Sequence, residues 1–143
     1  MVVNRLCAVA VSTAQTLAPD LATIEQLAQA AIERLPDQFR AHLAHVLLRI
    51  EDFPSNEVMD AMGLESEFDI LGLYQGVPLG DKSSMASGPM PDIIFLYRRP
   101  MLDYWADTAE SLEHIVTHVL IHEVGHHFGL SDADMERIEA AAE

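Results

Sequence analysis

The first clear hydrophobic pattern along the chain is a helical one. In the segment 20–35, DLATIEQLAQAAIERL, apolar residues recur every three or four positions and so share one face of a helix. Asp20 can cap the first turn, and Pro36 prevents the helix from continuing. The pattern predicts an amphipathic helix over 20–35, and DQFRAHLA at 37–44 favours a further turn.

Three apolar runs of strand length follow this helix. HVLLRIEDF at 45–53 predicts a buried strand, and DIIFLYR at 92–98 predicts another. ILGLYQGVPL at 70–79 also predicts a strand, and its glycines and proline place it at a sheet edge. A short helix is predicted at Asn56 to Met62, and the segment 80–91, rich in Gly, Ser and Pro, predicts a mobile loop.

The longest helical pattern lies near the end of the chain. The spacing of Asp107 and Glu110 suits a capping box and predicts a helix that begins near Asp107 and runs to Phe128. This helix is apolar nearly all round, which indicates a central buried element. Gly129 stands where helices commonly end in a left-handed residue, and DADMERIEAAAE at 132–143 predicts a final helix.

These elements predict an α+β fold. A three-stranded sheet would pack beside the central helix, with further helices flanking it on the N-terminal and C-terminal sides. A chain of 143 residues has the size of one ordinary domain. We therefore expect a single domain over 1–143, with residues 1–18 as an N-terminal arm.

Charge and cysteine content narrow the classes of function. The chain has 8 Lys and Arg against 23 Asp and Glu, a net charge of −15. Charge of this sign repels phosphate backbones and anionic membrane surfaces, so neither nucleic acid nor a membrane is expected as a partner. The single cysteine, Cys7, cannot form an internal disulfide and fits a reducing compartment. We expect a soluble, cytoplasmic protein, and the oligomeric state stays open.

The segment HEVGHHFGLSD carries the most specific chemical signal. Residues four apart stack on one face of a helix, so His122 and His126 can aim two imidazoles at one ion, with Glu123 beside them. Zinc binds neutral imidazoles and acidifies a water, whose proton a nearby carboxylate can accept. Gly129 can reverse the chain so that Asp132 offers an oxygen. The pattern H-E-x-x-H-x-x-G-x-x-D predicts a zinc site with Glu123 as general base and the ligands His122, His126 and Asp132.

Neighbouring residues compete for places in this site. His118 lies one turn before His122, and three ligands at four-residue steps on a straight helix span too far for one ion. We interpret His118 as pointing away from the metal, either behind the ligands or in the core. His127 is expected to be a packing or surface residue, and Met135 a core residue. Asp134 is expected in the first turn of the last helix. A purely structural alternative is that hydrogen bonds satisfy the buried histidines without any metal.

Three segments together resemble the minimal zincins, a family of small bacterial proteins described as metallopeptidases. They are ILGLYQGVPL, PDIIFLYRRPMLDY and HVLIHEVGHHFGLSD, and the likeness covers roughly Leu21 to Glu139. The resemblance implies a small zincin-like fold with the sheet beside the motif helix. It also implies Glu123 as the base and His122, His126 and Asp132 as the zinc ligands. The motif is similar to the metzincin pattern as well, except that the latter has a histidine where this chain has Asp132.

Two functions remain open. The first is a zinc-dependent hydrolase acting on a peptide or protein. Its edge strand GLYQGVPL would either hold an extended substrate by main-chain hydrogen bonds or serve only as part of the sheet. By residue type, Tyr97, Tyr104 and Arg98 are candidates for stabilising the oxyanion, and the sequence does not choose among them. The alternative is a non-catalytic domain whose metal or His/Asp cluster ties the last helix to the core, while the edge strand binds a partner protein.

Overall fold

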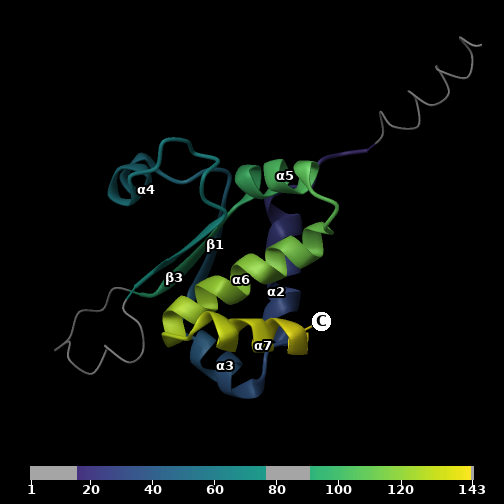
Figure 1. Ribbon diagram of the computed structural model, residues 1–143, viewed down its shortest axis with the longest axis vertical. Helices are drawn as coiled ribbons and strands as arrows, with labels where there is room; N and C mark the ends of the chain where they lie inside the picture. The colour runs from purple at the N-terminus through teal and green to yellow at the C-terminus, as the bar shows by residue number, and fades with distance from the viewer. Residues whose placement is uncertain (1–15, 77–90, 143) are drawn as a thin grey trace, which may run out of the picture.

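The computed structural model describes residues 16–76 and 91–142, and Figure 1 shows how their helices and strands are arranged. In chain order the elements are α2 (Leu21–Glu33), α3 (Asp37–Leu43), β1 (Leu47–Glu51), α4 (Asn56–Met62), β2 (Gly72–Gln75), β3 (Ile93–Tyr97), α5 (Arg98–Asp107), α6 (Leu112–Phe128) and α7 (Asp132–Ala142). One small three-stranded sheet with helices beside it confirms the predicted α+β class.

The central strand of the sheet is β3. It pairs in parallel with β1 and antiparallel with β2, and its Leu96 and Tyr97 are almost completely buried. The edge position predicted for β2 is confirmed. The prediction of a buried first strand is wrong, because β1 forms the other edge and Leu47 is 50% exposed. An apolar run of this length does not reveal whether both sides of the strand will be covered.

Helix α2 follows its predicted pattern closely. Asp20 caps it, since its Oδ1 accepts a hydrogen bond from the Thr23 backbone N–H at 2.8 Å. The buried face consists of Ile24, Ala28 and Ala31, which join the core beside α6. The periodic apolar positions of α2 therefore form one face, and this face packs against the central helix α6.

The segment before the motif helix differs from its prediction. Asp107 ends α5, which directly follows β3, and α6 begins only after Ser111, whose Oγ accepts the His114 backbone N–H at 3.1 Å. The predicted helix start near Asp107 is therefore wrong. Pro100 lies in the first turn of α5, where a missing N–H removes no intrahelical hydrogen bond.

Helix α7 packs back onto α6 after a short turn. Gly129 has a φ of 66°, the predicted left-handed residue, and the Leu130 N–H donates to the Gly125 carbonyl at 2.9 Å. Met135 is buried as predicted, and a Cβ added to Gly125 would lie 2.1 Å from its Sδ. The absence of a side chain at Gly125 is what lets the two helices approach so closely.

Some predictions fall on other parts of the chain. The expected loop at 80–91 lies outside the described residues except for Pro91, and so does most of the expected arm at 1–18. Among the helices of the described ranges, none has the length and apolar character needed to cross a membrane.

Candidate metal centre

Glu123 lies where α6 meets β2, and it is only 8% exposed. Gly72 makes this contact possible, because a Cβ there would lie 2.6 Å from Val119 Cγ1 and 3.3 Å from Glu123 Cγ. On its other side, the Oε2 of Glu123 lies 3.1 Å from Nδ1 of His126. The carboxylate is therefore largely removed from water while it keeps a polar partner.

This environment changes the acidity of Glu123. Burial raises the pKa of the carboxyl above its ordinary value, because a charged form is disfavoured where water is excluded. His126, a backbone hydrogen bond from Tyr74 and the nearby His122 act in the opposite direction and lower this pKa in part. A carboxyl group whose pKa is shifted toward neutrality is well suited to accept and return a proton.

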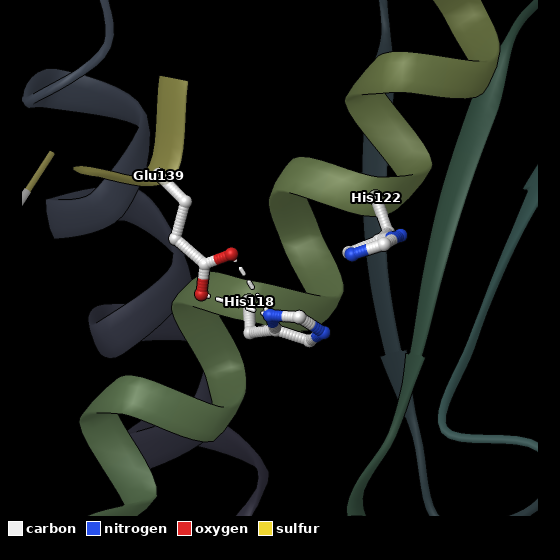
Figure 2. A group of neighbouring side chains, drawn as sticks. All are labelled: His118, His122 and Glu139. Carbon is white, nitrogen blue, oxygen red and sulfur yellow. Dashed lines mark hydrogen bonds and ion pairs between the residues drawn. The ribbon is translucent and has the colours of Figure 1, made fainter. Parts of the chain in front are cut away.

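The histidines of α6 form a stripe at four-residue spacing. The ring centroids of His118 and His122 lie 4.4 Å apart. Figure 2 shows that Glu139 of α7 reaches His118, whose Nδ1 lies 2.8 and 2.9 Å from the two carboxylate oxygens. One potential ligand atom from each of these three residues lies within 4.8 Å of the others. The expectation of a core position for His118 is wrong, because its side chain is exposed, and it lies beside His122, four residues along the same helix face.

The other predicted ligands are less closely grouped. His126 is exposed and turns to Glu123, and Asp132 is the exposed first residue of α7. Within the described part of the chain, no group of three potential ligands inside 4.8 Å includes either of them. Ser131 caps α7 by accepting the Asp134 N–H at 3.2 Å, which confirms the first-turn position of Asp134 and leaves Asp132 beside it at the positive end of the helix.

Two further residues have structural roles. His127 is buried on another side of α6, where its Nδ1 lies 3.2 Å from the Tyr74 hydroxyl and 3.5 Å from the Asp92 carboxylate. This matches the packing role expected for it. The Arg98 guanidinium forms an ion pair with Asp52 at 3.0 Å, on the β1 side of the sheet.

A groove of about 260 Å³ opens beside the histidine stripe. It is lined by Tyr104 of α5, by His114 and His118 of α6, and by Leu71, just before β2. Tyr97 lies beneath the surface instead, and burial, together with the charges of Glu51 and Glu123, raises the pKa of its hydroxyl to about 12. Tyr104, one of the residues considered for the oxyanion, therefore lines an open groove together with His114 and His118.

Sequence reasoning missed Glu139. The available signal was spacing, since Asp132, Met135 and Glu139 follow the i, i+3, i+7 pattern that places residues on one helical face. The burial of Met135 against Gly125 shows that this face turns toward α6. The spacing alone could not show which histidine Glu139 would meet.

A comparison with protein families matches residues 43–142 to the zincin-like metallopeptidases. The chain belongs to the zincin-like metallopeptidase family. The match runs from the end of α3 through α7 and includes the whole motif, and it confirms the resemblance seen in the sequence. Membership of the zincin-like metallopeptidases supports a metallopeptidase function and implies a divalent metal, usually zinc. No curated protein matches this zincin-like metallopeptidase.

Proposed function

We propose that the protein is a zinc-dependent peptidase that cleaves bonds in a peptide or protein substrate, with Glu123 as its general base. The observation that carries this proposal is the environment of Glu123, a buried carboxylate held by His126 next to an edge strand. A buried carboxylate is costly unless its charge is used or compensated. A role in packing alone would be met at lower cost by an uncharged side chain.

The ligands of the proposed zinc ion are His122, His126 and Asp132. Their donor types fit, since catalytic zinc sites use three protein ligands drawn from imidazole nitrogens and carboxylate oxygens. Both histidines lie on α6 with the base, which directly follows His122 and contacts His126, and Asp132 lies just beyond the helix turn. When bound, zinc would supply a Lewis acid that acidifies a water and polarises the peptide carbonyl.

Glu123 would accept the proton of the attacking water and return it to the leaving amine. Burial raises its pKa toward the working pH, which favours transfer in both directions. The hydrogen bond from His126 and the backbone of Tyr74 restrict how the carboxylate can turn.

The substrate backbone would lie along β2. The Tyr97 N–H donates to the Leu71 carbonyl, so hydrogen bonding to β3 alternates and the backbone groups of Gly72 and Tyr74 face away from β3. The Tyr74 backbone reaches Glu123 on this side. An extended peptide added to this edge would therefore pass next to the proposed base.

Peptide-library cleavage tests the proposal. We expect zinc-loaded protein to cleave members of a diverse library, read by mass spectrometry, and a chelator to stop the cleavage. His126→Ala should lose the activity, whereas His45→Ala, an exposed histidine before β1, should keep it. A folded, zinc-loaded protein that cleaves nothing would instead favour the non-catalytic alternative, in which the metal only ties α7 to α6.

A further inference from the structure

We propose that His118, His122 and Glu139 form a second site for a divalent cation, one helical turn from the motif site and sharing His122 with it. The shift is about 6 Å along α6, from a rise of about 1.5 Å per residue. The site is built at the contact of α6 with α7, as Figure 2 shows. Cation binding at this second site does not require peptidase activity, because the second site shares only His122 with the motif site.

The donor atoms are close to the arrangement that a small cation requires. Zinc bonds of about 2.1 Å in a tetrahedral site place ligand atoms about 3.4 Å from one another. The three candidate donors already lie within 4.8 Å. An ion pair between His118 and Glu139 would by itself leave His122 out, yet the two imidazole rings lie only 4.4 Å apart. To bind one ion, the three donors need to close from within 4.8 Å to about 3.4 Å, a change on the scale of side-chain rotation.

Packing holds the carboxylate of this site in place. Met135, one turn before Glu139 on α7, is buried against Gly125 of α6. The Glu139 side chain is 15% exposed and that of His118 is 49% exposed. The carboxylate is therefore largely withdrawn from water, whereas the imidazole faces the solvent. A cation can enter from the His118 side, and the net charge of −15 favours its approach.

The shared histidine makes the two sites alternatives. A neutral imidazole has one nitrogen available to accept a metal, so an ion on His118 and Glu139 removes His122 from the motif site. An ion in the second site would also lie away from Glu123, because Glu123 is held by His126, one turn further along α6. Occupation of the second site would leave the enzyme inactive. This consequence rests on the proposed function, but the existence of the second site does not.

Zinc titration of a variant without the motif site tests this proposal. In His126→Ala with Asp132→Ala, checked for folding by circular dichroism, a competing chelator dye should report one zinc per chain. Saturating zinc should raise the midpoint of thermal unfolding by about 5 to 10 °C at about 100 times the Kd. Adding His118→Ala or Glu139→Gln to this variant should weaken binding by more than about 100-fold, beyond what loss of an indirect partner produces. Glu136→Gln, exposed on the same helix, is the matched control and should change nothing.

The outcomes separate the two sites. If the folded His126→Ala, Asp132→Ala variant binds no zinc up to millimolar concentration, the second site is overturned, even if the wild type binds zinc and cleaves peptides. Equal zinc affinity with and without His118→Ala in that variant overturns it as well. If the variant binds zinc through His118 and Glu139 while the zinc-loaded wild type cleaves no peptide, the second site stands and the proposed function fails.

Discussion

The candidate metal ligands at the two ends of the contact between α6 and α7 are held differently. Toward the start of α6, His118 and His122 meet Glu139, with donor atoms within 4.8 Å. Toward the end of α6, His126 turns to Glu123 and Asp132 stays exposed. Yet Asp132 and Glu139 are seven residues apart and share one face of α7.

The difference follows from where each carboxylate lies relative to the helix packing. Glu139 lies one turn beyond Met135, whose side chain is locked against Gly125. Asp132 lies at the free start of α7, next to the cap formed by Ser131. Donors placed by helix packing are assembled in advance, whereas a donor at a helix end is fixed only when something binds it. We infer that the second site is preformed and that the motif site is completed by its ion.

Loss of His122 should have the largest effect on zinc binding, because this residue belongs to both proposed sites. We expect His122→Ala to weaken zinc binding by more than about 100-fold. Substitutions that leave all the ligands in place usually weaken it by at most that factor. His118→Ala or His126→Ala alone should weaken it less, since each leaves one end intact. Competitive zinc titration of the three variants, with His45→Ala as control, measures this order. Equal losses for all three would show that the ends are not alternatives.

The packing between the two ends can be disturbed at Gly125. A Cβ there would lie 2.1 Å from Met135 Sδ, so Gly125→Ala should lower the free energy of unfolding by about 1 to 3 kcal/mol through overpacking. Denaturant unfolding measures the change. Pairing it with Met135→Ala should cost less than the sum of the two single changes, because the clash is then absent. Strict additivity would argue against this contact.

Glu123 should lower stability at neutral pH in metal-free protein. Its folded-state pKa is raised, so the folded state holds the proton more tightly than the unfolded state. Stability is therefore greatest below the unfolded pKa, near 4.5, and falls as the pH rises toward the folded-state pKa. We expect Glu123→Gln to be more stable than wild type at pH 7 in chelator, with the difference vanishing on acidification. Denaturant unfolding across this pH range gives the answer, and a variant less stable at pH 7 would contradict it.

The smallest expected effect concerns the start of α6. Ser111 caps the helix, so Ser111→Ala should cost about 1 kcal/mol, the usual value for a lost cap. Asp107→Ala should cost close to nothing as a cap, because Asp107 ends α5. The same unfolding assay compares them. A larger loss of unfolding free energy for Asp107→Ala than for Ser111→Ala would instead support a helix that begins near Asp107.

Local patterns predicted much of the fold. Periodicity and the Asp20 cap located α2, and Gly129 located the end of α6. The same rules missed α5, because a proline in the first turn of a helix looks in sequence like a boundary. The burial of β1 was also misjudged, since it depends on which strands become its neighbours.

The candidate site was predictable in its motif and not in its surroundings. His122, Glu123 and His126 are placed by helical spacing alone. Glu139 meets His118 next to the place where Met135 packs on Gly125, a long-range contact that no local pattern contains. The choice of His122, His126 and Asp132 as ligands stays a prediction.

The most direct test of the central claim is the hydrolysis rate of Glu123→Gln on a peptide that the wild type cleaves. Zinc content and folding should be measured on the same samples, with Glu136→Gln as the matched control. We predict unchanged zinc content and a rate lower by about two to four orders of magnitude, the usual contribution of a general base. A rate equal to that of the wild type at equal zinc content would contradict the assignment of Glu123 as the base.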